Sequence, residues 1–388
     1  MENILSEMEA TLGASALSRN LTSLRLPIVT GTEPATSTAI QVLDILNTLY
    51  MPLVIYMGLV GNILSFVTFF FTHLKSRTSS LYMGSLAISD SGYLCVLSFV
   101  WLNERGINVY QQGWCQLLVF LSSAFGCWSV WLTVSFTAER FVAVRYPLWR
   151  LQMASKLRPK VTIMLTALFS FAFNSYLLLF VGVNDTDHGS PECSLNSDYE
   201  NALYYINILD TIITLIVPFV LITVMNFMIA RAIYLFYARY KQQRNICRPG
   251  HSSKDSLDAS PTKPDVSNSS STVAHATQIS VTRMLLLVST VFILLNLPSY
   301  VIRIYVFVLS LSDSITGSEP YVLQRYFMLL YYTNFAINFV LYNASSRMFR
   351  VTLCDYVQNR WSAIRDTLGT WKSNLTHSST SQNEDIII

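Results

Sequence analysis

The sequence predicts an all-α membrane protein, a seven-transmembrane helix bundle with a short juxtamembrane helix. Of the 388 residues, 52% are hydrophobic and only 13% are charged, which is about half the charged share of globular proteins. Seven segments contain the roughly 20 mainly apolar residues that a helix needs to cross about 30 Å of hydrocarbon. The net charge of +3 is too small for a nucleic-acid-binding protein, and the 13% aromatic content excludes a largely disordered chain.

The seven predicted spans leave a tail at each end of the chain. They cover residues 47–71, 80–102, 115–142, 161–183, 203–236, 281–311 and 321–343. The third, fifth and sixth spans are longer than the bilayer is thick, so we expect their helices to project beyond it. The predicted organisation is an N-terminal tail (1–46), a seven-transmembrane domain (47–345), a juxtamembrane helix (346–360) and a cytoplasmic tail (361–388). Residues rich in Ser, Pro, Asp and Lys predict a disordered third cytoplasmic loop at about 245–278.

The positive charges predict the orientation of the bundle. All but five of the 26 Lys and Arg residues fall on one side of the membrane, and that side is normally cytoplasmic. We therefore expect a multi-pass plasma-membrane protein with an extracellular N-terminus. No signal peptide is visible in the first 45 residues, so the first span is expected to start export itself. The sequons at Asn20 and Asn184 lie on the outer side, and we expect glycosylation at both.

Few ionisable side chains lie inside or at the ends of the predicted spans. Asp90 is in the middle of the second span, and Glu139 and Arg140 end the third. Asp210 and Arg303 lie in the outer halves of the fifth and sixth spans. A charge inside a membrane is costly, so each of these residues is a functional candidate. For any one of them the alternative is a buried structural hydrogen bond or a charge that extends to the headgroups.

These residues belong to a series of motifs that resembles the rhodopsin-like (class A) G-protein-coupled receptors. The series extends from about Tyr50 to Cys354 and keeps the family's order. Its members are Gly61-Asn62, Leu86-Ala87 with Asp90, Cys115, Glu139-Arg140-Phe141, Pro218, Phe292 with Pro298, Asn338-Phe339-Val340-Leu341-Tyr342 and Phe349-Arg350. Each motif is weak by itself, but together they are specific.

The resemblance implies an activation switch near the cytoplasmic face. Arg140 is expected to pair with Glu139 while the bundle is closed and to reach a cytosolic partner when the sixth span tilts outward. The alternative is an arginine that only anchors the helix end at the headgroups. Pro298 removes a backbone hydrogen bond and is expected to kink the sixth span, as Pro218 is expected to kink the fifth. The other switch residues are Asn296, Asn338 and Tyr342.

The only cofactor that the resemblance implies is an allosteric sodium ion at the centre of the bundle. Its candidate ligands are Asp90, Ser129, Asn334 and Asn338, whose oxygens suit a hard cation. The alternative is a water-filled hydrogen-bond network without a metal, since Phe335 replaces a hydroxyl that the family often supplies.

Three cysteines are expected to form covalent bonds, two in a disulfide and one with a lipid. The resemblance implies a disulfide between Cys115 and Cys193, and these two cysteines also lie nearest the oxidising face in the predicted topology. Cys354 follows the seventh span in an amphipathic stretch. It is a candidate for palmitoylation, with a plain free thiol as the alternative.

Four departures from the family pattern affect the activation path rather than the fold. Asn296 stands where most of the family has Trp, two residues before the proline of the sixth span. Phe339 replaces a proline in the seventh span, and Asn226 replaces a tyrosine in the fifth. The fourth span lacks its usual Trp and Pro.

The outer half of the bundle predicts a peptide ligand. Ser122 stands where amine receptors have Asp, and the seventh span has no Lys that could hold retinal, so both ligand classes are disfavoured. Asp210 could accept a ligand cation and Arg303 a carboxylate or carbonyl, or the two side chains could neutralise each other. The candidate pocket residues are Trp101, Gln116, Ser122, Ser123, Asp210, Tyr300, Arg303, Gln324, Tyr331 and Tyr332.

The resulting hypothesis is a receptor that binds an extracellular neuropeptide and activates heterotrimeric G proteins through outward tilt of helix six. The sixth and seventh spans look similar to invertebrate receptors for FMRFamide-like peptides. Arrestin, the lipid bilayer and a PDZ domain at the C-terminal 386–388 are further expected partners, and nucleic acid is not. The alternatives are a constitutively active orphan receptor or, less favoured, a seven-span transporter. No enzyme is expected, because all five His fall in loops or tails and catalytic motifs are missing.

Overall fold

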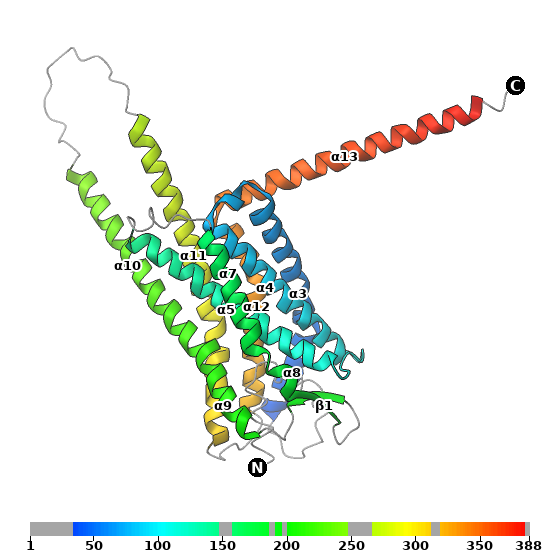
Figure 1. Ribbon diagram of the computed structural model, residues 1–388, viewed down its shortest axis with the longest axis vertical. Coiled ribbons are helices and arrows are strands. Elements are labelled where there is room, and N and C mark those ends of the chain that lie inside the picture. The colour runs from blue at the N-terminus through cyan, green and yellow to red at the C-terminus, as the bar shows by residue number, and fades with distance from the viewer. Residues whose placement is uncertain are drawn as a thin grey trace.

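The computed structural model describes residues 34–146, 157–185, 191–195, 200–246, 266–311 and 319–384 as a bundle of long helices with one small hairpin (Figure 1). The helices before the hairpin are α3 (Pro34–Phe71), the 3-10 turn η1 (His73–Ser76), α4 (Thr78–Glu104), α5 (Trp114–Arg145), α7 (Leu157–Asn174) and α8 (Leu177–Phe180). The hairpin is β1 (Val181–Asp185) and β2 (Pro191–Leu195). After it come α9 (Glu200–Asp210), the π-helical turn η3 (Thr211–Ile216), α10 (Val217–Ile246), α11 (Val266–Leu311), α12 (Glu319–Ser345) and α13 (Arg347–Glu384). The predicted modification at Asn20 and the predicted PDZ ligand at 386–388 lie outside the described residues.

Six helical segments of the described chain are long and apolar enough to cross a membrane. They lie in α3, α4, α5, α7 with α8, α9 to α10, and α11. The predicted seventh span is α12, which carries Gln324, Arg325, Asn334 and Asn338 among its apolar residues and is not one of the six. It nevertheless lies inside the bundle, packed against α11, α3 and α4. An all-α membrane protein, as predicted from the sequence, is confirmed.

Several helices extend beyond the ends expected from the sequence. Helix α3 begins at Pro34, a residue well suited to the first helical position, so residues 34–46 of the predicted N-terminal tail are helical. Helix α11 begins at Val266, inside the segment assigned to a disordered loop. Helix α13 continues to Glu384, beyond the expected end at Arg360. These extensions are polar or amphipathic, and apolar content alone does not detect them.

The fourth span ends earlier than predicted because its last residues form a strand. β1 pairs with β2 in antiparallel fashion, with Val181 opposite Leu195 and Val183 opposite Cys193. The predicted glycosylation site Asn184 lies within β1. Valines favour strands, but the short apolar stretch from Val181 to Val183 directly after an apolar helix cannot be separated from that helix by hydropathy.

Helices α3, α4 and α12 pack closely because small residues lie between them. A Cβ added at Gly58 would lie 2.7 Å from the Cβ of Ala336 and 2.6 Å from Cδ1 of Leu94. Membrane helices use such residues to bring backbones together. One turn further on, the side-chain amide of Asn62 donates to the backbone carbonyl of Phe335 at 2.9 Å. The polar residues of α12 are therefore held at a fixed position against α3.

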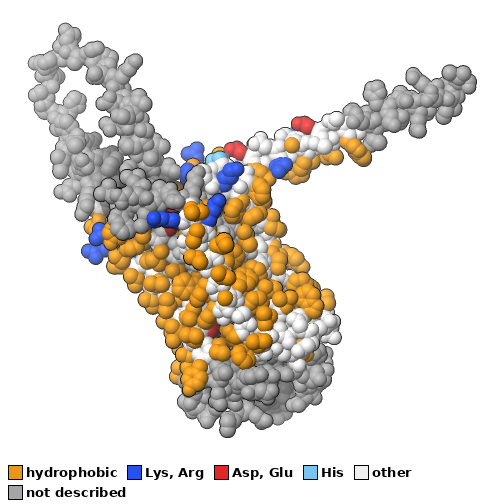
Figure 2. Space-filling model, viewed as in Figure 1, with side chains coloured by type: hydrophobic (Ala, Val, Ile, Leu, Met, Phe, Trp, Pro, Cys, Tyr) orange, Lys and Arg blue, Asp and Glu red, His pale blue; other side chains and the backbone are white. Residues whose placement is uncertain are grey.

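Apolar side chains cover the length of the bundle, whereas Lys and Arg gather at the end from which α13 leaves (Figure 2). Large hydrophobic residues such as Leu53, Met164 and Phe227 are more than half exposed along α3, α7 and α10. Such a surface suits lipid rather than water. The distribution agrees with a multi-pass membrane protein whose basic end is the predicted cytoplasmic end.

Candidate functional site

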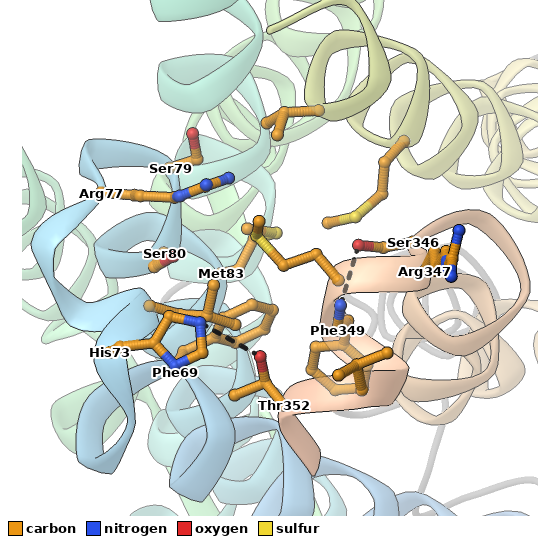
Figure 3. A pocket seen from close by; sticks show the side chains of 15 residues that line it. Phe69, His73, Arg77, Ser79, Ser80, Met83, Ser346, Arg347, Phe349 and Thr352 are labelled. Carbon is orange, nitrogen blue, oxygen red and sulfur yellow. Dashed lines mark hydrogen bonds between the residues drawn. The ribbon is translucent and has the colours of Figure 1, made fainter. Parts of the chain in front are cut away.

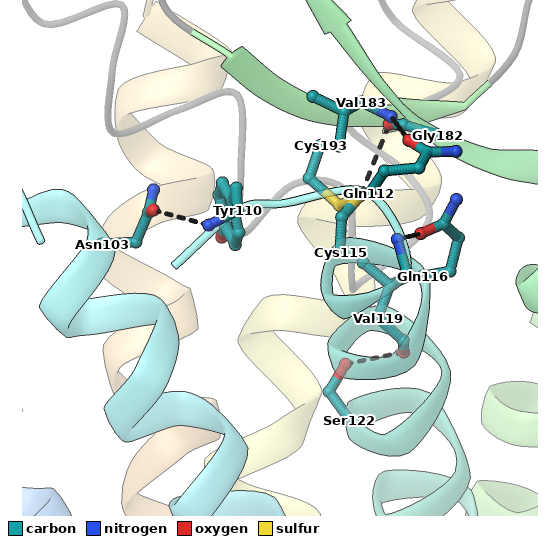
Figure 4. The surroundings of a disulfide bond; sticks show 11 residues. Asn103, Tyr110, Gln112, Cys115, Gln116, Val119, Ser122, Gly182, Val183 and Cys193 are labelled. Atoms are coloured by element: carbon teal, nitrogen blue, oxygen red, sulfur yellow. Dashed lines mark hydrogen bonds between the residues drawn. A yellow bond between two sulfur atoms is a disulfide. The ribbon is translucent and has the colours of Figure 1, made fainter. Parts of the chain in front are cut away.

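The hairpin is tied to the outer end of α5 (Figure 4). Cys115 and Cys193 form a disulfide with a Cα–Cα distance of 5.7 Å, which confirms the predicted pairing. The backbone N–H of Val183 also donates to the side-chain oxygen of Gln112, at 3.4 Å. Gln116, a predicted pocket residue, accepts the backbone N–H of Gly113 at 2.6 Å and caps α5. The hairpin is therefore fixed beside the outer part of the bundle.

An ion pair connects the outer halves of the fifth and sixth spans. Arg303 of α11 donates through Nη2 to Oδ2 of Asp210 of α9 at 3.0 Å. The two side chains are only 16% and 11% exposed. Of the two possibilities that the sequence left open, the structure shows mutual pairing. The Nε atom of Arg303 is buried and has no partner among the described residues, so one strong donor of the pair is available to a ligand.

The ion pair is positioned by an irregular segment of the fifth span. Directly after Asp210, the chain makes the π-helical turn η3, in which Val217 N–H bonds to the carbonyl of Ile212. Pro218 follows, and its missing N–H leaves a carbonyl in the preceding turn without a helical partner. Thr214 donates its hydroxyl to the carbonyl of Asp210 at 2.7 Å. The predicted distortion at Pro218 thus takes the form of a π turn, a feature common at functional sites.

Several tyrosines lie near the ion pair. Tyr300 is 8% exposed, and both Tyr300 and Tyr331 are close enough to Asp210 and Arg303 to interact electrostatically with them. The ring of Tyr331 makes an edge contact with Tyr93, at 6.0 Å between centroids. Tyr93 was not among the predicted site residues, although it lies one helical turn after Asp90 and could have been found from that spacing.

Tyr93 connects this group to the seventh span. Its ring stacks on Phe335 at 3.9 Å and lies 6.4 Å from the ring of Tyr332. Tyr332 is 5% exposed. Tyr176 is a second aromatic residue that the sequence analysis missed, and it too lies within electrostatic range of the ion pair.

The remaining predicted pocket residues have different surroundings. Trp101 donates through Nε1 to the carbonyl of Asn47 at 3.2 Å, so it contacts α3. Ser122 is buried and donates to the carbonyl of its own helix at Val119. Ser123 is half-buried, and Gln324 is buried in α12. The structure therefore gathers the charges and tyrosines, whereas Trp101 bonds to α3 and Gln116 caps its own helix.

A polar cluster lies at the centre of the bundle. Asp90 is fully buried and accepts hydrogen bonds from Ser129 Oγ at 2.8 Å and from Asn338 Nδ2 at 2.7 Å. Asn334 is also buried, and its backbone carbonyl lies 3.5 Å from the same Asn338 nitrogen. A carboxylate with neighbouring hydroxyl and amide oxygens is a donor set that fits a sodium ion. The same groups also form a hydrogen-bonded network by themselves, which is the second arrangement expected from the sequence.

At the predicted cytoplasmic end, Arg140 pairs with Glu139 at 2.9 Å, as expected from the sequence. Arg140 also donates to Ser79 Oγ at 2.7 Å, and Glu139 accepts the hydroxyl of Thr78 at 2.5 Å. The two partners in α4 were not predicted from the sequence. Arg140 is thus held both by its neighbour and by the second span.

Next to this pair is a cavity of about 670 Å³ between η1, α4, α11 and the start of α13 (Figure 3). Its wall is apolar at Phe69, Met83 and Phe349 and polar at Ser79 and Arg347. His73 lies 3.4 Å from the hydroxyl of Thr352 across one side of it. The other lining residues are Leu74, Arg77, Ser80, Val281, Met284, Ser346, Met348 and Val351.

The predicted hinge of the sixth span lies in the interior of α11. Pro298 is inside the helix, and Asn296 is fully buried. The Asn296 amide donates to the carbonyl of Phe292 at 2.7 Å, but its oxygen has no partner among the described residues. The hydroxyl of Tyr342 is likewise buried without a partner in the described chain, and its ring contacts Phe349. Two switch residues therefore carry unsatisfied polar atoms in this conformation.

Comparisons with known proteins agree with this arrangement. A family model described as "7 transmembrane receptor (rhodopsin family)" matches residues 61–342. The thyrotropin-releasing hormone receptor of Gallus gallus is 24% identical over 316 residues, which cover 79% of this chain and 77% of that protein. The growth hormone secretagogue receptor type 1 of Sus scrofa is 26% identical over 312 residues, or 76% of each chain. The thyrotropin-releasing hormone receptor of Bos taurus is 26% identical over 322 residues, covering 78% of this chain and 76% of that protein.

Proposed function

The chain belongs to the rhodopsin family of seven-transmembrane receptors, and from this premise we propose that it binds an extracellular peptide and activates heterotrimeric G proteins. The observation that carries the proposal is the buried ion pair between Asp210 and Arg303, with tyrosines around it. The similar receptors named above have hormones or secretagogues as their ligands by name. A short amidated neuropeptide of the FMRFamide-like kind supplies a cation, aromatic groups and a terminal carbonyl, which match this site.

The ion pair gives the ligand a way to act on the bundle. While Asp210 and Arg303 bind each other, they hold α9 and α11 together. A peptide whose cation binds Asp210 and whose carbonyl binds Arg303 replaces one internal contact with two contacts to itself. The ligand then shifts the equilibrium between the resting and the activated arrangement of the two helices. The size of the shift is set by the difference between its affinities for these two arrangements.

On the cytoplasmic side, the proposal assigns the G protein to the cavity beside Arg140. Outward tilt of the inner part of α11 at Pro298 enlarges this cavity, since Val281 and Met284 of α11 form one of its walls. Arg140 then exchanges Glu139 and Ser79 for groups of the partner. Exchange of a paired charge between partners is a common form of switching.

The centre of the bundle is the proposed sodium site. Asp90 with the oxygens of Ser129, Asn334 and Asn338 would hold the ion, whose charge would favour the resting packing of the surrounding helices. We expect sodium chloride, compared with choline chloride, to weaken agonist binding to the wild-type receptor. The Asp90→Asn variant should lose that difference. Equal sodium dependence in the variant would exclude this site.

High basal signalling is a second candidate property, and the buried oxygen of Asn296 favours it. An unpartnered buried polar atom costs about 1–3 kcal/mol, and here it lies two residues before the hinge proline. The cost raises the free energy of this packing, and movement of α11 can relieve it. Assays of second messengers without ligand distinguish this case from a silent resting receptor. A transporter is the remaining alternative, and ion flux without a second messenger would favour it.

Several further assignments are part of the proposal. The receptor lies in the plasma membrane with its N-terminus outside, and Asn20 and Asn184 are glycosylated. Cys354, exposed on α13, is the palmitoylation site. Phosphorylated Ser and Thr in the tail recruit arrestin, and the C-terminal 386–388 binds a PDZ domain.

The deciding experiment is a screen of amidated neuropeptides on cells that express the receptor, with calcium and cyclic-AMP readouts. Arg303→Ala and Asp210→Ala should each abolish the response to the active peptide while surface expression persists. Arg105→Ala is the matched control, since it removes an outer positive charge that bonds to Thr48 instead. An unchanged dose response in the Arg303 and Asp210 variants would remove both residues from the site.

A further inference from the structure

A second pair of opposite charges lies between α4 and α12. Glu104 is the last residue of α4, and Arg325 lies near the start of α12. The two side chains are close enough to attract each other electrostatically. Within the described part of the chain, however, neither makes a hydrogen bond or a salt bridge. This open pair therefore differs from Asp210 and Arg303, whose charged atoms contact each other at 3.0 Å.

Two neighbouring tyrosines connect the open pair to the ion pair of the fifth and sixth spans. Tyr332 lies within electrostatic range of both Glu104 and Arg325. Tyr331 lies within the same range of both members of the ion pair. The rings of the two tyrosines are 5.9 Å apart between centroids. A short peptide bound at the ion pair can therefore extend over these rings and reach the open pair.

The backbone on both sides of the open pair is held by its neighbours. The side-chain oxygen of Asn103 accepts the backbone N–H of Tyr110 at 3.1 Å and fixes the chain that follows α4 (Figure 4). Tyr326 donates its hydroxyl to the backbone carbonyl of Ala39 at 2.7 Å and holds the start of α12 against α3. The side chains of Glu104 and Arg325 are themselves half-buried. Two fixed helix ends therefore present opposite charges to the same small space.

The charges of the open pair indicate which chemical group fits between them. A cation would be attracted by Glu104 but repelled by Arg325, and a carboxylate would meet the opposite combination. A primary carboxamide is neutral, and it has an NH₂ group that donates and a carbonyl oxygen that accepts. It can donate to Glu104 and accept from Arg325, which gives two charge-assisted hydrogen bonds without a third charge. This is the group at the C-terminus of an amidated peptide.

We propose that Glu104 and Arg325 bind the C-terminal carboxamide of the peptide ligand and discriminate against the free acid. This inference rests on the proposed peptide-binding function and adds the terminal group that the ligand must carry. The cation of the peptide lies at Asp210, a backbone carbonyl lies at Arg303, and the terminus lies between α4 and α12. The bound ligand thus connects the fifth and sixth spans to the second and seventh.

The test compares two probes, the amide and the free acid of the dipeptide arginyl-phenylalanine, on the full-length receptor in nanodiscs. Each probe supplies a cation, an aromatic ring and a terminus, and the two differ only at the terminus. Saturation-transfer NMR measures the dissociation constant of each. We expect the amide to bind about 30-fold more tightly, because the acid loses a charge-assisted hydrogen bond and meets the like charge of Glu104.

Charge variants shift the preference for the amide in opposite directions. Glu104→Gln should reduce it to about threefold or less, because Gln can donate to a carboxylate as well as accept from an amide. Arg325→Gln should raise the preference, because the acid loses a charged partner and the amide loses only a hydrogen bond. Loss of structure alone would not move one ratio both ways. Arg105→Gln is the matched control, since this neighbouring charge bonds to Thr48 and its removal should leave the ratio unchanged.

Asp210→Ala separates this site from the site of the proposed function. It should weaken both probes equally and leave their ratio as it is, because it removes only the partner of the cation. If it weakens neither probe while Glu104→Gln still abolishes the preference, the assignment of Asp210 fails and the carboxamide site stands.

Three outcomes would overturn the carboxamide site. The first is equal affinity of the wild-type receptor for the amide and the acid. The second is a preference that is the same in Glu104→Gln as in the wild type, which would reduce the open pair to a structural feature of the helix ends. The third is the absence of binding by either dipeptide to the wild-type receptor.

Discussion

Removing the charge of Arg303 alone is expected to destabilise the unliganded receptor far more than removing the charges of both Asp210 and Arg303. The charged atoms are 3.0 Å apart and the side chains are 16% and 11% exposed. At an effective dielectric constant of about 20, charges at this distance attract by about 5 kcal/mol. A buried charge left without its partner costs about 3–5 kcal/mol, and the partial exposure here favours the lower end.

The variants are therefore Arg303→Gln, Asp210→Asn and the double variant. We expect each single variant to lose about 3 kcal/mol and the double variant about 1 kcal/mol, because Asn and Gln restore a neutral hydrogen bond. The difference is the coupling energy of a double-mutant cycle. Both single variants and the double variant should fail to respond to the peptide, since ligand binding needs both charged side chains. The stability of the resting fold requires only that neither charge is left without its partner.

A thiol-reactive dye measures this stability in detergent. Cys127 is buried and reacts only when the bundle opens, whereas the exposed Cys95 and Cys354 are replaced by Ser together with Cys247. At about 2 °C per kcal/mol, the single variants should melt about 6 °C below the parent and the double variant within about 2 °C of it. Arg105→Gln is the control for an exposed charge and should stay within about 1 °C. Equal melting of single and double variants would refute the coupling and the role of the pair as an internal contact.

Three further predictions concern the switch and the hairpin. Glu139→Gln should raise basal signalling about fivefold in a second-messenger assay. The 2.9 Å ion pair that holds Arg140 is partly exposed and contributes about 1 kcal/mol to the resting state. Unchanged basal signalling would contradict this role of the pair. Asn296→Leu should raise the melting temperature by about 2 °C and lower basal signalling, because it removes an unpartnered buried oxygen; a rise in basal signalling would argue against this. Cys193→Ser should lower the melting temperature by about 4–8 °C, because it opens a disulfide between residues 78 apart; an unchanged temperature would show that the hairpin adds nothing to stability.

The sequence was sufficient for those features that depend on composition and local order. The helices follow from apolar length, and the pairing of Glu139 with Arg140 follows from their adjacency. The disulfide partners Cys115 and Cys193 follow from the family pattern and from the side of the membrane on which they lie. Each of these inferences needs only the type of a residue and its position in the sequence.

The missed features depend on which face of a helix meets which neighbour. Trp101 and Tyr93 are both aromatic residues of α4, yet Trp101 binds the backbone of α3 and Tyr93 joins the tyrosine group. Apolar periodicity could not separate them, because nearly every face of a helix inside a bundle is apolar. The length of α13 was missed for a related reason, since its distal half is amphipathic and has too few apolar residues to resemble a span.

The contacts between the fifth and sixth spans suggest why the outer ion pair is the point at which a ligand acts. Asp210 and Arg303 join these spans at the outer end, and Ser289 donates to Asn226 at 2.8 Å further in. At the cytoplasmic end, Arg283 donates to the hydroxyl of a tyrosine of α10 at 3.1 Å. A tilt of α11 must carry α10 with it or break these contacts. A ligand in the outer pocket reaches only the pair of Asp210 and Arg303. This contact joins opposite charges, so the charged and polar groups of a peptide can take the place of either partner. The two inner contacts, neither of which joins opposite charges, then set the resistance that the binding free energy has to overcome.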